Sequence, residues 1–409
     1  MSMTNKPLLA IVFTVFLDLL GYGIVIPVIA PLFLSASTGL FPVGTSEQIR
    51  LATMGLLIAM FPLFQFFSAP VLGTLSDRFG RKKPLMLCIL GTGFGYLLFG
   101  IGILTHQLWL LFLGRIIDGI TGGNISIAMS AIADISTSKS KPKNFGLIGM
   151  AFGVGFIIGP FLGGKLSDPE LVSWFNFATP FWFAAILCLA NLFVVARLFP
   201  ETLKERITRK VSLSTGFTNL YNAFTTPKVR GIFIVSFLVT FAFSLFTQFI
   251  QVFLLKEYSW NQSRIGEYFA YIGVCVALAQ VLLIGRVSAR YRPGQVLSFS
   301  IFFLAISLFV TILPTAGWMM YAIAPFIAVF NGLSTPNLTT VISDLAPASS
   351  QGEILGINQS VQAMAQAIPP IIGGLIVAQY HTYPIIASGF ITLFAWFFFL
   401  AHARKTKSY

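Results

Sequence analysis

The stretch GTLSDRFGRKK, from Gly73 to Lys83, is a short charged turn between two long apolar runs. A degenerate copy, GRVSARYRPG from Gly285 to Gly294, stands between two further apolar runs. About 20 apolar residues allow an α-helix to cross a hydrocarbon core of roughly 30 Å, and short basic turns between such helices stay on the cytoplasmic side. The two turns therefore predict a duplicated membrane protein with its basic turns in the cytoplasm.

The composition of the 409-residue chain argues against a water-soluble globule. Hydrophobic residues make up 56% and charged residues 10% of the chain, against roughly 25% charged residues in ordinary globular domains. The formal net charge of +13 falls in short connectors between apolar runs, which indicates membrane orientation and argues against nucleic-acid binding. Its histidines and cysteines lack metal-ligand spacing, so we expect no metal site and no cofactor.

Hydropathy predicts an all-α polytopic protein with twelve transmembrane helices. The expected spans run over Leu8–Leu34, Leu51–Leu72, Pro84–Leu104, Leu108–Ile132, Phe145–Leu166, Phe177–Leu198, Val229–Leu255, Ile265–Ile284, Val296–Leu313, Trp318–Val341, Ile354–Ala378 and Thr382–Ala403. Lysine and arginine concentrate at both ends of the chain and in the connectors after every second span. We therefore expect a multi-pass protein of the inner (plasma) membrane with both termini in the cytoplasm.

The spans divide into two pseudo-symmetric halves of six. A polar, basic connector at residues 199–228 is expected to link an N-terminal bundle, residues 1–198, to a C-terminal bundle, residues 229–409. The halves repeat at a spacing of about 210 residues: Gly119, Thr121, Asn124, Gly146, Pro160, Gly163 and Gly164 align with Gly332, Ser334, Asn337, Gly356, Pro370, Gly373 and Gly374. Parallel six-span repeats are the architecture of rocking secondary transporters.

The charged turn itself is a candidate gate. Gly73 is expected to let two helices approach closely, and Asp77 to pair with a nearby arginine or a helix N-terminus, latching one conformation. The basic residues of the turn, among them Arg78 and Arg81 around Gly80, are expected on the water side. A plain positive-inside turn is the alternative interpretation. The degenerate copy has Ala289 where the first turn has Asp77, so the expected latch is asymmetric.

Three ionisable residues lie inside predicted spans. Asp18 is about ten residues into the first span, hence roughly 15 Å deep and near the midplane. Arg115 and Asp118, at positions i and i+3 of the fourth span, share a helix face. A charge at such depth costs at least about 2.5 kcal/mol unless it meets a partner or water. Arg115 and Asp118 are either a structural ion pair or, with Asp18, the groups that couple transport to protons.

The ordered set Gly73, Asp77, Arg78, Gly80 and Arg81 closely resembles the signature between helices two and three of the major facilitator superfamily. Leu111, Arg115 and Gly119 resemble the fourth-helix motif of its drug:proton antiporters. The fifth-helix motif of that branch is matched by Gly155, Gly159, Pro160, Gly163 and Gly164. The resemblance implies a twelve-helix major facilitator fold, a proton-transfer role for Arg115 and an antiport role for the fifth-helix motif.

Within that branch the chain is most similar to tetracycline-type exporters, through LDLLGYGIVIP at Leu17 to Pro27 and LAQVLLIGRVSAR at Leu278 to Arg290. It departs from them in the ninth helix. Those exporters carry an acidic residue there, whereas residues 296–313 here supply only apolar and hydroxyl side chains. The proton-carrying acids are therefore expected in helices one and four.

Polar side chains inside the spans outline a candidate substrate cavity. They are Asn124, Gln248, Gln251, Asn331, Asn337, Gln359, Gln362 and Gln366. The last three follow helical spacing on one face. With few fixed charges, such a cavity suits a partly apolar organic ligand, although each residue can instead bond a neighbouring helix.

The sequence thus predicts a monomeric secondary active transporter, not an enzyme, which exports a drug-like or other small organic compound in exchange for protons. The proton gradient is its energy source, since no phosphate-binding P-loop signature occurs in the chain. The nearest alternative is a proton-coupled importer of a metabolite or siderophore-like solute. A non-transporting receptor or a membrane enzyme is a more remote one.

Overall fold

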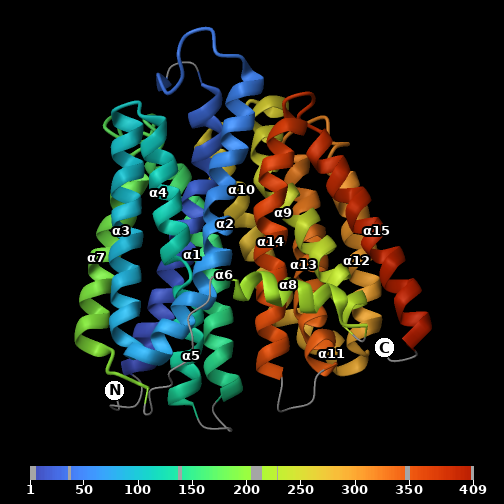
Figure 1. Cartoon of the computed structure of the whole chain (residues 1–409). Helices are drawn as coiled ribbons and strands as arrows, with labels where there is room; N and C mark the ends of the chain where they lie inside the picture. Colours follow the sequence, from blue (N-terminus) through green and yellow to red (C-terminus); the bar gives the residue numbers. More distant parts are fainter. Residues whose placement is uncertain are drawn as a thin grey trace. The chain divides into compact units, whose positions relative to one another are not determined.

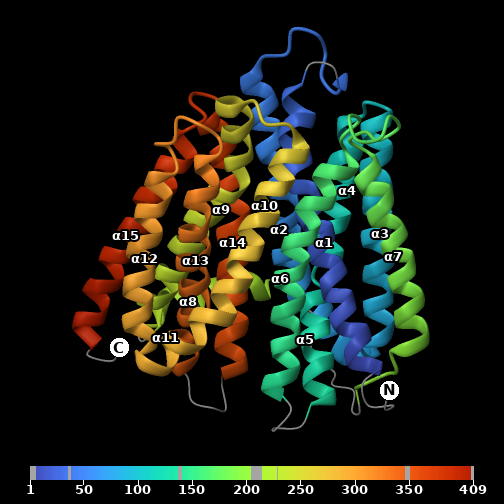
Figure 2. The same ribbon diagram turned by 180° about the vertical axis from the view of Figure 1, so that it is seen from behind.

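A computed structural model describes residues 6–35, 38–136, 141–203, 214–227, 229–345 and 351–406. Throughout these residues the regular secondary structure is helical. The elements are α1 (Lys6–Leu34), α2 (Glu47–Phe79), α3 (Lys82–Leu104), α4 (Leu108–Thr121), α5 (Asn124–Ile135), α6 (Lys141–Leu166), α7 (Thr179–Leu198), α8 (Thr215–Thr225), α9 (Arg230–Tyr258), α10 (Gln262–Ala279), a π-helix (Gln280–Ile284), α11 (Gly285–Arg290), α12 (Pro293–Val310), α13 (Met319–Asp344), α14 (Gln351–Val377) and α15 (Tyr383–Thr406). Figures 1 and 2 show them from opposite sides.

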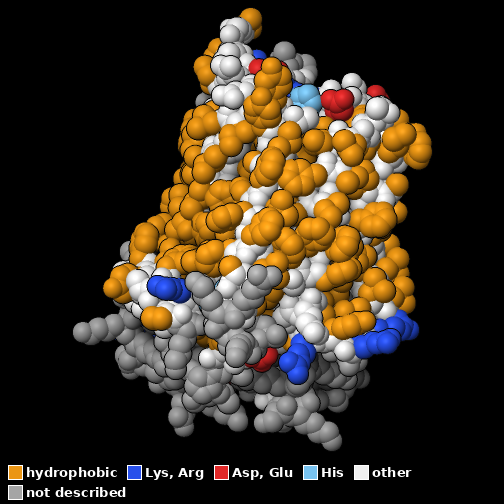
Figure 3. All heavy atoms as spheres, turned by 90° about the vertical axis from the view of Figure 1, so that its right-hand side faces the viewer, with side chains coloured by type: hydrophobic (Ala, Val, Ile, Leu, Met, Phe, Trp, Pro, Cys, Tyr) orange, Lys and Arg blue, Asp and Glu red, His pale blue; other side chains and the backbone are white. Residues whose placement is uncertain are grey.

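The predicted all-helical membrane architecture is confirmed. Within the described residues, ten helices are long and apolar enough to cross a membrane, with α4 and α5 forming one of them. The fifth predicted span, Phe145–Leu166, lies within α6, and the eighth corresponds to α10 with its π-helical continuation. Figure 3 shows the resulting surface over α12 and α15, where a broad apolar belt lies between two ends that carry charged side chains, with lysine and arginine prominent at the lower end.

The fourth span differs from the expected continuous helix. It divides into α4, which ends at Thr121, and α5, which begins at Asn124. Gly122 and Gly123 occupy the break. The apolar pattern does not reveal this break because hydropathy runs uninterrupted through it, whereas two adjacent glycines weaken the helix locally.

The chain forms two compact units. Unit 1 comprises Met1–Ser46, Met60–Thr215 and Asn261–Ala270, and unit 2 comprises Glu47–Ala59, Gly216–Trp260 and Tyr271–Tyr409. The first turns of α2 thus belong to unit 2, and the first half of α10 belongs to unit 1. A core of unit 1 gathers around Ile11, Ile89 and Ile132, and a core of unit 2 around Phe233, Leu297 and Val361.

A pair of glycines brings two helix backbones together in each unit. In unit 2, a Cβ placed on Gly55 of α2 would lie 3.0 Å from the Cα of Gly374 in α14 and would overlap the carbonyl oxygen of Pro370. In unit 1, a Cβ on Gly164 of α6 would lie 2.5 Å from the carbonyl oxygen of Gln262 in α10 and 3.2 Å from the Cα of Gly266. Small residues permit such backbone approach in membranes, where dispersion forces rather than hydrophobic burial hold helices together.

The two glycine crossings are repeats of each other. Gly55 and Gly266 are about 210 residues apart, as are Gly164 and Gly374, which matches the sequence repeat. Each crossing thus joins the second helix of one half to the fifth helix of the other. Lys165, next to Gly164, forms an ion pair with Glu267 of α10 beside the unit 1 crossing.

We predict that Gly55→Ala lowers the stability of the purified protein by about 1–3 kcal/mol, the usual cost of overpacking a tight contact. Gly332→Ala is the matched control, because a Cβ on this helical glycine would meet nothing within 4 Å. That control should leave stability unchanged or raise it slightly through better helix propensity. Thermal unfolding of both variants checks this, and equal melting temperatures would contradict a tight crossing at Gly55.

Candidate functional site

A hydrogen-bonded pair, formed by the partly buried carboxylate of Asp18 and the buried amide of Asn124, links α1 to α5. The Nδ2 of Asn124, the first residue of α5, donates a hydrogen bond of 2.7 Å to Oδ2 of Asp18 in α1. Asn124 is 1% exposed, and its Oδ1 is buried without a hydrogen-bond partner. Asp18 has no ion-pair partner within the described part of the chain, and Arg115 pairs with Asp118. The structure therefore holds this carboxyl group inside the bundle with a neutral neighbour and an unused acceptor beside it.

The break between α4 and α5 positions Asn124. At the break, Gln65 of α2 donates a 2.8 Å hydrogen bond to the carbonyl oxygen of Gly122, and Ser68 donates one of 3.2 Å to that of Gly119. A Cβ on Gly123 would lie 2.9 Å from the Cα of Ala69, so only glycine lets α2 approach this closely. Carbonyls released by a broken helix inside a membrane need such donors. Side chains of α2 thus satisfy backbone carbonyls at the break, and the break places Asn124 against α1.

Arg115 and Asp118 form a buried ion pair on one face of α4. The Nη1 of Arg115 lies 3.0 Å from Oδ2 of Asp118, and the two side chains are 5% and 6% exposed. The guanidinium carbon lies 4.9 Å from the ring centroid of Phe61, while Nε has no hydrogen-bond partner. The pair is neutral as a whole and rests on an aromatic face, which suits an arrangement held inside a low-dielectric bundle.

The fifth-helix motif packs its glycines in two directions. Ideal Cβ atoms on Gly155 and Gly159 would lie 2.8 Å from Leu19 Cβ and 2.5 Å from the Leu20 carbonyl oxygen, and one on Gly163 would overlap Ile24, all in α1. Gly164 instead faces α10, as does the carbonyl of Pro160, which lies where a Cβ on Gly266 would be. The motif therefore lets α6 pack directly against α1, the helix that carries Asp18.

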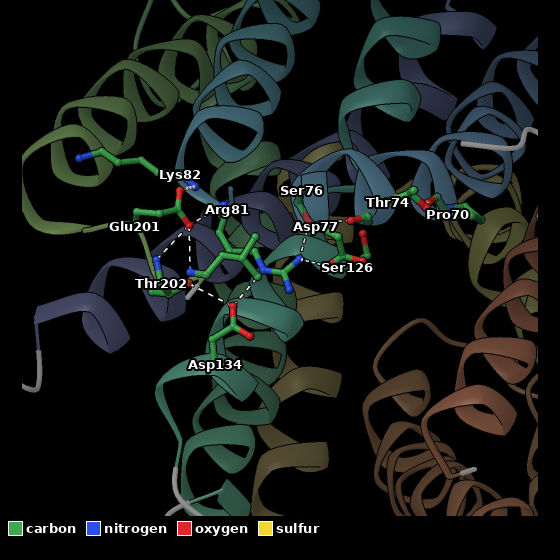
Figure 4. Close-up of polar contacts among 12 residues, drawn as sticks. Pro70, Thr74, Ser76, Asp77, Arg81, Lys82, Ser126, Asp134, Glu201 and Thr202 are labelled. Carbon is green, nitrogen blue, oxygen red and sulfur yellow. Dashed lines mark hydrogen bonds and ion pairs between the residues drawn. The ribbon is translucent and has the colours of Figure 1, made fainter. Parts of the chain in front are cut away.

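At the far end of α2 the charged turn builds a second polar cluster (Figure 4). Arg81 is 5% exposed. Its Nη1 lies 2.6 Å from Oδ1 of Asp77 and 2.6 Å from Ser76 Oγ, and its Nε lies 3.0 Å from Oδ2 of Asp134 at the end of α5. One guanidinium thus joins α2 to α5 through charge-assisted hydrogen bonds to two carboxylates.

Glu201, just after α7, caps the start of α3. Its Oε1 accepts hydrogen bonds of 2.8 Å from the backbone N–H of Arg81 and of 3.0 Å from those of Thr202 and Leu203, and its Oε2 accepts one of 3.3 Å from Lys82 (Figure 4). Partial burial works to raise the pKa of Glu201, but these four backbone hydrogen bonds outweigh it and the pKa is lowered. Gly80, at φ +93°, has the same carboxylate where a Cβ would be, so the turn requires glycine here.

Two expectations about this turn are wrong. A Cβ on Gly73 would lie 3.6 Å from Ser126 Oγ, an ordinary contact, so Gly73 is not needed for close helix approach. Arg81 does not lie on the water side, because two carboxylates and a serine draw it inside the helix ends. Arg78 is exposed, with its guanidinium 5.3 Å from the Phe79 ring, and Asp77 pairs with Arg81 rather than with it.

The polar residues expected to line a cavity differ in their burial and in their hydrogen bonds. Gln248 and Gln251 are buried, and Gln251 donates 3.0 Å to the carbonyl oxygen of Gln248 within α9. Asn337 donates to Leu333 of its own helix, unlike its repeat partner Asn124, which reaches across to α1. The remaining four, all at least partly exposed, are Asn331, Gln359, Gln362 and Gln366.

The sequence profile of the Major Facilitator Superfamily matches residues 11–368 and, in a second match, residues 232–408. The tetracycline resistance protein, class C, of Escherichia coli is 30% identical over 370 residues, which cover 90% of this chain and 89% of that protein. The chain belongs to the Major Facilitator Superfamily. The resemblance inferred from the charged turn and the helix motifs is thereby confirmed.

A further relative and two solved structures are similar to the chain, the structures in fold. Multidrug resistance protein 2 of Bacillus subtilis (strain 168) is 27% identical over 383 residues, covering 93% of this chain and 90% of that protein. Among solved structures, a D-xylose-proton symporter matches with a TM-score of 0.77 at 17% identity, covering 96% of both chains. A bacterial homolog of the human lysosomal transporter Spinster also matches at 0.77, with 16% identity and coverages of 98% and 97%. The chain is a membrane transporter of this superfamily and not an enzyme.

Sequence reasoning missed four residues that organise this transporter's polar clusters. Asp134 and Glu201 were visible only as charges near span ends, because their partner Arg81 lies 53 and 120 positions away. The role of Gln65 could not be predicted, because no sequence pattern indicates that the carbonyl oxygen of Gly122 needs a donor from α2. Asn358, 2% exposed, accepts a 2.8 Å hydrogen bond from Ser236 and ties α14 to α9.

No group of three or more histidine, cysteine, aspartate or glutamate side chains able to hold a metal occurs within the described residues.

We predict that Glu201→Gln reduces stability near neutral pH but matters progressively less in acid. The folded-state pKa of Glu201 is lowered from its usual 4.5, so its ionised form contributes stability above that value, and the contribution disappears as pH falls through the lower folded pKa. Melting temperatures of wild type and Glu201→Gln, measured from about pH 7 to about pH 4, should converge toward acid. A difference independent of pH would contradict a role for the charged cap.

We also predict strong coupling between Arg115 and Asp118. Arg115→Gln or Asp118→Asn leaves one buried charge without its partner, which costs about 3–5 kcal/mol, whereas the double variant removes both charges and recovers much of that loss. A double-mutant cycle on thermal stability measures the coupling. Additive single effects would show that the two side chains do not depend on each other.

Proposed function

We propose that this transporter exports an organic, partly apolar compound in exchange for protons, by alternating access. The observation that carries the proposal is Asp18, a carboxyl group within α1 whose hydrogen-bond partner is the neutral Asn124 and which has no ion-pair partner in the described chain. A carboxylate in this setting can be neutralised by a proton or by a cationic group of a substrate. The two cannot occupy it together, and such competition is what an exchange mechanism requires.

Arg115 and Asp118 are proposed to tune that exchange. Their ion pair is complete in this conformation, which leaves Asp18 as the group open to a proton. A rearrangement of α4 that loosens the pair would free Asp118 for protonation and bring positive charge toward Asp18. Asp18 is then the main proton carrier, with Asp118 and Arg115 setting when it loads and releases.

Two observations favour export over import: the fifth-helix motif, and the similarity of the chain to drug-resistance proteins. The class C protein from Escherichia coli is a tetracycline resistance protein, and the one from Bacillus subtilis is a multidrug resistance protein. We propose that the substrate of this chain is likewise a drug-like organic compound. The transporter is proposed to work as a monomer in the inner membrane with both termini in the cytoplasm, because lysine and arginine crowd the termini and the alternate connectors.

The test is transport in proteoliposomes with an imposed pH gradient. Tetracycline, ethidium, a siderophore and a sugar are supplied in turn, and proton movement is recorded with a pH-sensitive dye. The wild-type transporter should exchange protons for tetracycline or ethidium. Substrate and proton moving in the same direction, or coupled movement of only the siderophore or the sugar, would favour an importer instead.

We predict that Asp18→Asn abolishes coupled proton movement, because the amide can neither gain nor lose the proton. Glu170→Gln, in the exposed loop before α7, is the matched control and should retain wild-type coupling. Substrate binding measured in parallel distinguishes loss of coupling from loss of folding. Unchanged proton flux in Asp18→Asn would reassign that residue to a structural role.

A further inference from the structure

The short helix α8, Thr215–Thr225, lies in the connector between the predicted halves and carries no charged residue. Its faces differ. Gly216 and Ala223 are buried, and Asn219 donates a 3.0 Å hydrogen bond to Ser360 Oγ of α14. On the other side are three exposed aromatic residues, Phe217, Tyr221 and Phe224, which are 52%, 69% and 37% exposed and follow i, i+4, i+7 spacing.

Two contacts fix the depth of α8 within unit 2. The ring of Phe224 packs edge-on against Phe237 of α9, with centroids 6.1 Å apart. Phe237 is seven residues beyond the start of α9 at Arg230, which is about 10 Å along the helix. Ser360, the partner of Asn219, is nine residues beyond the start of α14, about 13 Å along that helix.

α8 therefore does not project beyond the helix ends into water. It lies beside α9 and α14, within the length of both, and Figure 1 shows it crossing α14 well before the end of that helix. An uncharged helix with a row of exposed aromatic side chains would be unusual in the cytosol, where exposed faces are typically charged. At the boundary between lipid headgroups and acyl chains, however, aromatic side chains are enriched.

We propose that α8 is an interfacial helix whose face formed by Phe217, Tyr221 and Phe224 is covered by lipid of the cytoplasmic leaflet. The rings enter the upper acyl region, the tyrosine hydroxyl stays among the headgroups, and exposed Arg230 at the start of α9 meets lipid phosphate. The opposite face stays on α9 and α14. The connector is thereby anchored at the membrane surface where it joins unit 2.

Site-directed spin labelling of the full-length transporter in lipid nanodiscs tests this. Cys88, Cys188 and Cys275 are first replaced by alanine, and single cysteines are introduced as Tyr221→Cys and, separately, Phe217→Cys. Leu189→Cys, on an apolar position of α7 that is 61% exposed, is the lipid-facing control, and Glu170→Cys is the water-facing control. Each label is probed with oxygen, which partitions into lipid, and with a water-soluble nickel chelate.

The labels on α8 should show an oxygen-to-nickel accessibility ratio several-fold above that of Glu170→Cys and approaching that of Leu189→Cys, with a depth of about 5–10 Å below the phosphates. A ratio equal to that of Glu170→Cys would place the face in water and overturn the proposal. Protection from both reagents would mean that protein covers the face, which also overturns it. The readout needs no substrate, so it stands or falls separately from proton-coupled export.

Discussion

A charged side chain within a lipid-immersed helix bundle must find a partner, a proton or water, and this constraint organises unit 1. Arg115 satisfies it through Asp118 on the next turn of the same helix. Asp18 satisfies it only in part, through the amide of Asn124. The break in the fourth span exists where Asn124 has to reach α1, and donors from α2 compensate the backbone groups that the break releases. The break between α4 and α5 costs free energy, and it places the amide of Asn124 where it bonds the carboxyl group of Asp18.

The helix α5 connects that carboxyl group to the charged turn. Its first residue, Asn124, bonds Asp18, and near its other end Asp134 bonds Arg81, about 15 Å away along the helix. Arg81 in turn holds Asp77 at the end of α2, the helix whose middle supports the break. In the proposed mechanism, a change in the charge of Asp18 would therefore act on a helix whose opposite end bonds Arg81.

Much of this architecture follows from the sequence, and the limits are physical. Twelve apolar runs, a repeat of about 210 residues and the charged turn were sufficient for the fold, because length and hydropathy dictate membrane spans. The pairing of Arg115 with Asp118 follows from helical spacing. The pairing of Asp18 with Asn124 and of Arg81 with Asp134 could not be predicted, because it depends on which helix faces meet. Gly73 and Arg81 were misjudged for the same reason: a motif gives residue types but not their surroundings.

The central claim is that substrate binding displaces a proton from the carboxyl group of Asp18. It is tested most directly by measuring proton release from the purified transporter in weakly buffered detergent. Tetracycline or ethidium is added and the pH change is recorded for wild type and Asp18→Asn. The account predicts proton release on addition of whichever compound the wild-type protein binds, and none from Asp18→Asn at matched occupancy. Equal release from both proteins would contradict it.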